Sequence, residues 1–157
     1  MTQDLLKDLL QNIKIKERIK NPRSVATHYL NQQSWKLHEE FYKIIENDNL
    51  TRVIIIAPRN HGKSETFAHT LPIWAYLNNN NLRILIASKS HDQAVKFLSL
   101  IKQDFEKNDK IKQDFGDLTS TPWQVDNIFL KRDSKIQLKD PSIEAVGVGG
   151  GITGAHF

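Results

Sequence analysis

Cysteine is absent from this chain of 157 residues. The absence excludes disulfides and any metal site built from thiolates. Apolar runs long enough to span a membrane are also missing, and the N-terminus lacks the basic-then-apolar pattern of a secretory signal. We therefore expect a protein that works in the cytoplasm and does not contact the membrane.

The composition is that of a globular protein, with 39% apolar and 25% charged residues, and the length suits one hydrophobic core. The net charge is +4. The positive excess lies in residues 51–100, where six lysines and arginines oppose two acidic residues. A basic centre suits a polyanionic ligand, although it does not distinguish a nucleotide from a nucleic acid.

The most informative stretch is residues 52–66. Four apolar β-branched residues at 53–56 predict a strand that is buried on both faces. A loop at 57–61 follows, and residues 62–64, Gly-Lys-Ser, then open a predicted helix. A strand, a loop and a helix N-terminus in this order are the context of a phosphate-binding loop.

The residue types in this loop suit a nucleoside triphosphate with magnesium. A helix N-terminus offers free N–H groups and a positive dipole end to an anion. Gly62 lets the backbone approach a phosphate, Lys63 would reach the β- and γ-phosphates, and the Ser64 hydroxyl would hold magnesium. The pattern asks for glycine where this chain has Ala57. The competing interpretation is an ordinary strand–turn–helix with a surface lysine.

The predicted site extends over the loop and a segment upstream of it. Gln32, Gln33 and Trp35 are candidates to contact an adenine ring, because glutamine pairs with its edge and an aromatic ring stacks on it. The alternative is surface glutamines with a core tryptophan, and His38 is expected at the core edge. The predicted nucleotide-binding residues of the loop are Ala57, Pro58, Arg59, Asn60, His61, Gly62, Lys63, Ser64 and Glu65.

The first 23 residues form a predicted segment of their own. Five aliphatic residues at helical spacing predict an amphipathic helix over residues 4–19. They are Leu5, Leu6, Leu9, Leu10 and Ile13. The basic cluster that follows is either a solvated helix end or an arm that docks a partner or nucleic acid. Asn21 and Pro22 mark a break.

Residues 24–47 predict one or two helices, in which a stripe from Trp35 to Ile45 packs in the core. A helix from Lys63 to Tyr76 should kink or break at Pro72. Strands are expected at 82–87 and 143–148, a hairpin at 128–130 and 135–138, and turns over 108–123. The glycine-rich residues 147–154 suggest a hinge or a strand-crossing loop. Together with the strand at 53–56, these elements predict a βαβ unit and a parallel sheet.

Ser88, Lys89 and Ser90 follow the second predicted strand. Ligands bind beyond the carboxyl ends of parallel strands, so these residues are candidates to contact a nucleic-acid backbone. The alternative is that Ser90 caps the helix predicted at 92–107. Both roles are compatible with each other.

The loop at 57–64, Ala-Pro-Arg-Asn-His-Gly-Lys-Ser, resembles the variant Walker A loop of large terminase subunits. These are the DNA-packaging motors of tailed bacteriophages, and their loops often read Pro-Arg-x-x-Gly-Lys-Ser. Residues 84–94 resemble the segment that follows in that family, and residues 149–157 resemble the glycine loop before its Walker B strand. The resemblance covers roughly residues 32–157.

The resemblance implies an ATPase with a P-loop NTPase-type parallel sheet, flanked by helices and preceded by N-terminal helices. ATP and magnesium would be its cofactors. Lys63 would be the phosphate lysine, and Arg59 would stabilise the γ-phosphate rather than form a surface salt bridge. The implied partners are double-stranded DNA, the small terminase subunit and the portal protein, within an oligomer in the cytoplasm of a bacterial host.

One part of such a motor is not found in the sequence. A P-loop ATPase needs a carboxylate at a strand end to hold magnesium and an acidic group to orient water. No apolar run here ends in acidic residues, and in the family that strand would begin after Phe157. We therefore expect residues 24–157 to be the N-terminal part of the ATPase domain, with an incomplete sheet and the nuclease domain absent. Such a piece would be a fragment, a split-gene product or a truncated relic.

Two other functions remain open at this point. A helicase-like, nucleic-acid-dependent ATPase shares the phosphate loop and the nucleic-acid contact after the second strand. A non-catalytic module would instead bind partners through the helix that carries the leucines. An incomplete sheet would also expose unpaired strand edges, so we expect association or poor solubility.

Overall fold

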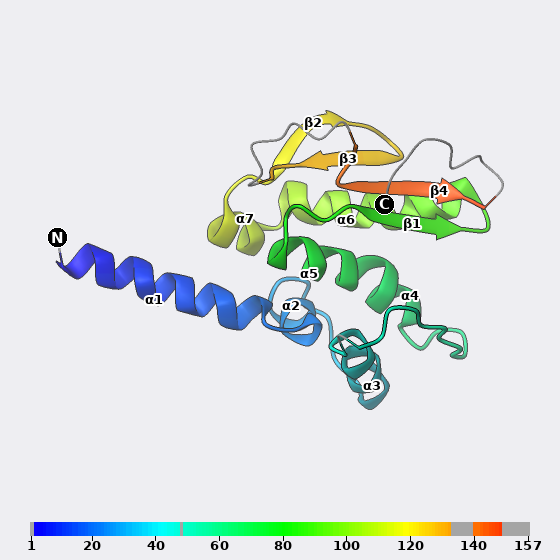
Figure 1. The fold of residues 1–157 in the computed structure, drawn as a ribbon, viewed down its shortest axis with the longest axis horizontal. Coiled ribbons are helices and arrows are strands. Elements are labelled where there is room, and N and C mark those ends of the chain that lie inside the picture. The colour runs from blue at the N-terminus through cyan, green and yellow to red at the C-terminus, as the bar shows by residue number, and fades with distance from the viewer. Residues whose placement is uncertain (1, 48, 133–139, 149–157) are drawn as a thin grey trace.

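The structure is a computed structural model that describes residues 2–47, 49–132 and 140–148. Over these residues the chain forms an α/β fold with a four-stranded mixed sheet (Figure 1). The α/β class is therefore confirmed. A parallel sheet had been expected, but two of the three strand pairs are antiparallel.

The elements follow one another from an N-terminal run of helices to the sheet. The helices are α1 (Thr2–Ile19), α2 (Pro22–His28), α3 (Lys36–Ile45), α4 (Lys63–Glu65), the π-helix η1 (Thr66–Thr70), α5 (Leu71–Asn78), α6 (His91–Lys107) and α7 (Asp109–Phe115). The strands are β1 (Ile84–Ser88), β2 (Thr119–Trp123), β3 (Asn127–Leu130) and β4 (Ile143–Gly147). The structure thus confirms the helices predicted at 4–19, 24–47 and 92–107 and the strands predicted at 82–87 and 143–148.

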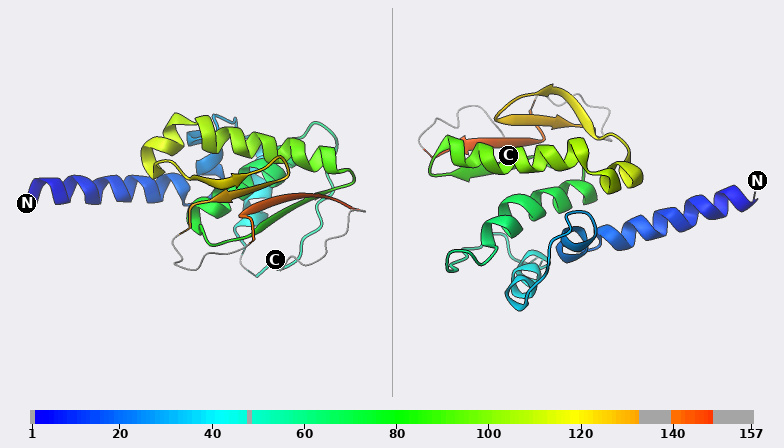
Figure 2. Two further views of the ribbon diagram at one scale, coloured as in Figure 1. Left: turned by 90° about the horizontal axis from the view of Figure 1, so that it is seen from above. Right: turned by 180° about the vertical axis from the view of Figure 1, so that it is seen from behind.

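The sheet has the strand order β1-β4-β3-β2. Strands β1 and β4 are parallel, with Ile86 beside Ala145, and β3 is antiparallel to both β4 and β2. Helix α6 crosses one face of the β1–β4 pair (Figure 2). Within the described residues, β1 is therefore an edge strand with one side unpaired.

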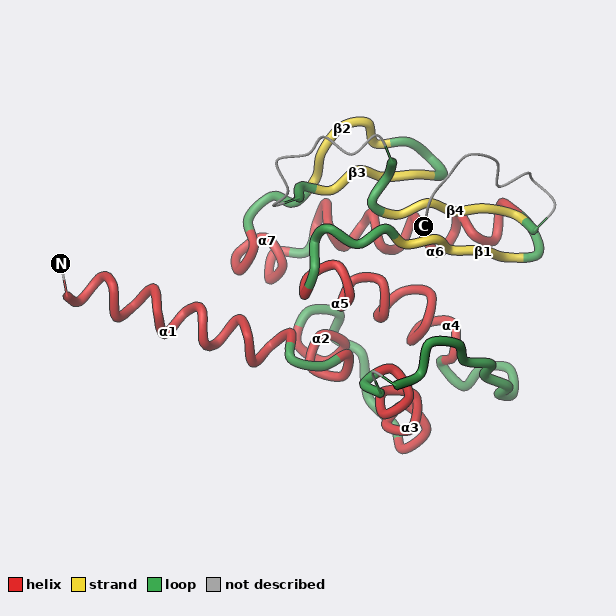
Figure 3. Tube along the Cα trace, in the orientation of Figure 1, coloured by secondary structure: helices red, strands yellow, loops and turns green. Residues whose placement is uncertain are grey.

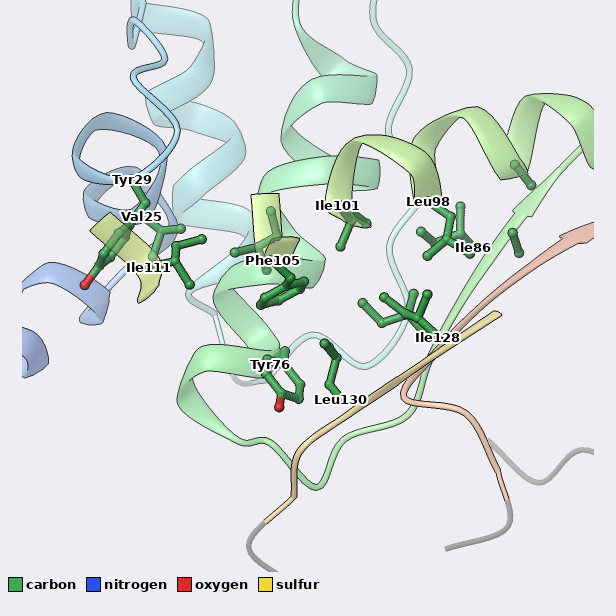
Figure 4. Packing of buried hydrophobic residues seen from close by; sticks show 14 residues of the cluster. Val25, Tyr29, Tyr76, Ile86, Leu98, Ile101, Phe105, Ile111, Ile128 and Leu130 are labelled. Atoms are coloured by element: carbon green, nitrogen blue, oxygen red, sulfur yellow. The ribbon is translucent and has the colours of Figure 1, made fainter. Parts of the chain in front are cut away.

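The core lies between α2, α5, α6 and the sheet (Figure 4). Helix α6 contributes Ala94, Leu98, Ile101 and Phe105, which follow one another at intervals of four, three and four residues. This spacing places all four side chains on one face of the helix, which explains both the helix and its orientation. The ring of Phe105 meets that of Tyr76 edge-on, with 5.3 Å between centroids.

The helix that begins at Lys63 runs through α4, η1 and α5 as one continuous rod. Pro72 lacks an N–H group and cannot bond to the carbonyl four residues before it. The backbone widens into a π-helical turn just before this proline, where the Leu71 N–H bonds to the Thr66 carbonyl. The disturbance predicted at Pro72 is therefore present, but the helix continues beyond it to Asn78.

The strand predicted at 53–56 is wrong, and with it the βαβ unit that it would have started. This segment is irregular (Figure 3), and the side chains of Ile54 and Ile56 are 91% and 94% exposed. Val53 and Ile55 instead line an apolar cavity with residues of α3 and η1. The segment keeps the alternation of a strand, but it lacks the hydrogen-bonded neighbour that a strand requires.

The region expected to consist of turns, 108–123, holds α7 and β2 instead. The Asn108 side chain caps α7 by accepting from the backbone N–H groups of Lys110 and Ile111. Strand β3 confirms one arm of the predicted hairpin, but its partners are β2 and β4. The other arm, 135–138, and the glycine residues 149–154 lie outside the described residues.

The remaining expectations concern the N-terminal region and the membrane. The break predicted at Asn21 and Pro22 is present, because α1 ends at Ile19 and the Asn21 side chain caps α2 by accepting from the Ser24 N–H. Phe41 and Tyr42 of the predicted α3 stripe are buried, whereas Trp35 is exposed. None of the described helices has the length and apolar character needed to cross a bilayer.

Candidate nucleotide site

The loop that enters α4 turns sharply at two residues with left-handed backbone conformation. Asn60 has φ +63° and Gly62 has φ +69°. A Cβ atom on Gly62 would lie 2.0 Å from Nε2 of His38. Both the backbone angle and the neighbouring ring therefore require glycine at this position.

His38 belongs to α3 but contacts the phosphate loop. Its Nδ1 accepts a hydrogen bond from the backbone N–H of Trp35 at 3.2 Å. Because Nδ1 is an acceptor there, the hydrogen of a neutral ring resides on Nε2, which faces Gly62. His38 was expected only at the edge of the core, and its position against Gly62 of the loop was not predicted. The sequence gives no local signal for this contact, because 23 residues separate the two positions.

A cavity of about 400 Å³ lies between the loop and the segment before α3. Gln32, Gln33 and Trp35 line one part of it, and loop residues 60–62 line another. The structure therefore brings the two predicted parts of the site together. Trp35 is 69% exposed, so the alternative of a core tryptophan is wrong.

The amide of Gln32 is held in one orientation at the cavity. Its Oε1 accepts from the Thr70 hydroxyl at 2.7 Å, and its Nε2 lies 3.4 Å from Nδ1 of His69. Nε2 of His69 lies 2.6 Å from a carboxylate oxygen of Asp104 on α6. These contacts fit a histidine that donates to Asp104 and accepts from Gln32. The network was missed at the sequence level because it depends on how η1 and α6 pack.

Tyr42 forms another part of the cavity wall. Burial raises the pKa of its phenol, and the nearby Glu39 carboxylate acts in the same direction. A raised pKa keeps the hydroxyl protonated at neutral pH. Tyr42 and Trp35 thus form a neutral, aromatic part of the cavity wall, which suits a flat, uncharged ring, and Glu65 also lines the cavity.

A smaller cavity of about 270 Å³ lies at the predicted phosphate-binding residues and is lined by Pro58 and residues 60–65. The Lys63 ammonium donates to the Ala57 carbonyl at 3.2 Å. The Arg59 carbonyl accepts from Nδ1 of His61 at 2.7 Å, and the Arg59 side chain is exposed. Within the described residues Arg59 forms no salt bridge, so its guanidinium is available to a ligand.

Ser64 lies where the loop meets a third cavity, of about 690 Å³, between the helical rod and β1. Its hydroxyl is a suitable magnesium ligand, and Ser88 at the end of β1 lines the same cavity. Three acidic or histidine side chains grouped as metal ligands do not occur in the described parts of the chain. The loop thus offers one hydroxyl oxygen that could hold magnesium, and among the described residues no carboxylate cluster accompanies it.

The three candidate nucleic-acid contacts, Ser88, Lys89 and Ser90, lie at the end of β1 and just after it. Ser90 caps α6, as predicted, by accepting from the Gln93 N–H at 3.3 Å. The Ser88 hydroxyl donates to the Gln93 side chain at 2.9 Å, and Lys89 is exposed. Capping accounts for Ser90, whereas the contact of these residues with nucleic acid stays a prediction.

No family model, curated protein or solved structure matches this chain. The terminase resemblance therefore rests on the residues of the loop and its flanks. The geometry adds the base-sized cavity beside the loop and the residues that line it.

Proposed function

We propose that this chain binds ATP and magnesium as part of a bacteriophage DNA-packaging ATPase of the large terminase type. One observation supports the proposal most strongly. The cavity beside the phosphate loop is lined by Gln32, Gln33 and Trp35, which are polar and aromatic groups of the kind that recognise a purine. The competing interpretation, an ordinary strand–turn–helix with a surface lysine, does not predict such a cavity.

The adenine ring would occupy this cavity. Trp35 offers an exposed indole for stacking, and the two glutamines offer amide donors and acceptors to the edge of the base. The Gln32 amide is already fixed by Thr70 and His69, so little orientational entropy is lost when a base binds.

The triphosphate would lie along the loop from Pro58 to Glu65. The backbone N–H groups at the start of the helical rod and the Lys63 ammonium attract its negative charge. Lys63 would exchange its bond to the Ala57 carbonyl for a bond to phosphate. Arg59, exposed on the same loop, would neutralise charge at the γ-phosphate. The Nε2–H of His38 adds a donor behind Gly62.

Magnesium would be held by the Ser64 hydroxyl and by phosphate oxygens, and would neutralise part of their charge. Because no carboxylate cluster accompanies Ser64 in the described residues, the proposal for these residues is nucleotide binding rather than hydrolysis. Contact of Lys89 with double-stranded DNA, and assembly with a small terminase subunit and a portal protein, belong to the same proposal through the resemblance.

The cavity can be tested separately from the loop. Replacing Trp35 by alanine should weaken ATP binding by about 10-fold, because a stacked base contributes on the order of 1–3 kcal/mol. Gln33→Ala should also weaken it, because the edge of the base loses a hydrogen-bond partner. Binding of inorganic triphosphate should be unchanged, since it has no base. Calorimetric titration of both ligands measures this difference. Alanine variants that bind ATP as tightly as the parent chain would contradict the adenine assignment.

A second experiment separates the packaging motor from a helicase-like ATPase. If the motor that contains this chain is a terminase, it should transport DNA directionally into a capsid shell, driven by ATP and dependent on Lys63, whereas a helicase should not. Transport that is absent while DNA unwinding is present would favour the helicase alternative.

A further inference from the structure

Helix α1 carries an apolar stripe that nothing in the described chain covers. Its side chains are 49–71% exposed, although all five are aliphatic. They are Leu5, Leu6, Leu9, Leu10 and Ile13. The helix extends away from the rest of the molecule, and its N-terminal end is remote from the sheet (Figure 1).

The C-terminal end of α1 is fixed to the body. The Ile19 carbonyl accepts from the Trp74 indole at 3.0 Å and from the Asn78 amide at 2.9 Å. Since both donors belong to α5, the helix is anchored at this end to the rod that begins at the phosphate loop.

The side of α1 that faces the body is polar. Gln11 and Arg18, two helical turns apart, both donate to the Asp114 carboxylate of α7, at 3.2 Å and 2.6 Å. The Asp114 side chain is 1% exposed and also accepts from the Tyr29 hydroxyl. Turning the leucine stripe inward would break the bonds from Gln11 and Arg18 and leave a buried carboxylate without its cation, which is costly. The stripe is therefore held facing outward.

We propose that this stripe is an interface between two copies of the chain, in which two α1 helices pack antiparallel. A two-fold axis brings the same surface of each copy together, so one apolar stripe suffices for both partners. Each of the ten side chains exposes on the order of 100 Å², which amounts to about 1,000 Å², the lower end for a specific interface. The inference does not depend on nucleotide binding.

The charge along α1 favours the antiparallel arrangement. Asp4 and Asp8 outnumber Lys7 in its N-terminal half, whereas Lys14, Lys16 and Arg18 outnumber Glu17 in its C-terminal half. Parallel helices would place both basic ends together. Antiparallel helices that cross near Leu9 place the two Lys16 residues about 21 Å apart along the axis, beyond a screening length of about 10 Å. They also oppose the helix dipoles and keep the two bodies at opposite ends of the pair.

The absence of cysteine makes the arrangement directly testable. If the helices cross near Leu9, Leu5 of one copy lies opposite Ile13 of the other. A mixture of Leu5→Cys and Ile13→Cys chains should form a disulfide between unlike chains, and Leu5→Cys alone should form none. Asp4→Cys is the control, because Asp4 is seven residues from Gln11 and lies on the side that faces the body.

Sedimentation equilibrium of the full chain supplies the second measurement. The parent chain should be a dimer, and Leu9→Glu should raise the dimer dissociation constant by at least about 100-fold, because it places a carboxylate between two apolar stripes. The melting temperature at low concentration should be unchanged, since Leu9 is exposed. Lys7→Glu, which introduces the same side chain off the stripe, should remain dimeric.

Three results would overturn the proposal. If the parent chain sediments as a monomer, the stripe does not bind a second copy, and its partner would be a different protein or a lipid surface. A dimer that persists in Leu9→Glu would place the interface elsewhere, such as at the unpaired edge of β1. A disulfide formed by Leu5→Cys alone would show that the helices are parallel.

Discussion

At the scale of single residues, the site depends most on the contact between Gly62 and His38. Alanine at position 62 must adopt a left-handed backbone, at a cost of about 1–2 kcal/mol, and must also displace the His38 ring. We therefore predict that Gly62→Ala lowers the free energy of unfolding by about 2 kcal/mol or more and abolishes ATP binding. Urea denaturation and calorimetry measure the two effects.

A double-mutant cycle separates the two costs of this substitution. In a His38→Ala background the steric cost disappears, so Gly62→Ala should cost only its backbone share. An equal loss of stability in both backgrounds would show that the ring does not confine this position.

A second residue-scale prediction concerns the pH dependence of stability. Burial raises the pKa of Glu144 on β4, and the carboxylates of Asp126 and Asp140 raise it further. The folded state therefore holds this proton more tightly than the unfolded state does. The stabilising contribution is complete below the unfolded pKa and is lost as the pH rises through the higher folded pKa.

Glu144→Gln removes this titration. We predict that it raises the free energy of unfolding at pH 7 by about 0.5 kcal/mol, a small value because water screens a partly exposed group. Stability should also fall less between pH 4 and pH 7 than in the parent chain. Urea denaturation at a series of pH values is the measurement, and identical pH profiles for the two proteins would refute the assignment.

At the scale of elements, α6 connects the sheet with the site. Its N-terminus is capped by Ser90, and Ser90→Ala should lower the free energy of unfolding by about 1 kcal/mol because an N–H group loses its partner. Ser99→Ala on the same helix is the matched control. The Ser99 hydroxyl bonds only to the Val95 carbonyl within the helix, so its loss should be nearly neutral. Equal effects of the two substitutions would argue against the cap.

The same elements show what local sequence can predict. Helix α6 and strands β1 and β4 were predicted correctly because their periodicity, cap and β-branched residues act within each segment. The apolar run at 53–56 carries an equally strong strand signal, yet a strand also needs a partner edge, which no local window contains. Helix α7 and β2 were missed because they are short and polar.

At the scale of the whole molecule, the site joins segments that are distant in the chain. The sequence predicted the loop and the candidate adenine contacts Gln32, Gln33 and Trp35. The structure places these three residues and part of the loop around one cavity, although their contact with ATP stays a prediction. His38, and the network of Gln32, His69 and Asp104, were not predicted. They depend on tertiary packing of α3, η1 and α6, for which a single sequence gives no spacing rule.

The measurement that tests the central claim most directly is calorimetric titration of ATP with magnesium into the parent chain and into Lys63→Ala. The account predicts measurable binding to the parent chain and at least about a 10-fold weaker affinity for the variant, with an unchanged melting temperature. Lys96→Ala, which removes an exposed lysine of α6, should bind like the parent chain. If Lys63→Ala binds ATP as tightly as the parent chain, or the parent chain binds none, the nucleotide site is not at this loop.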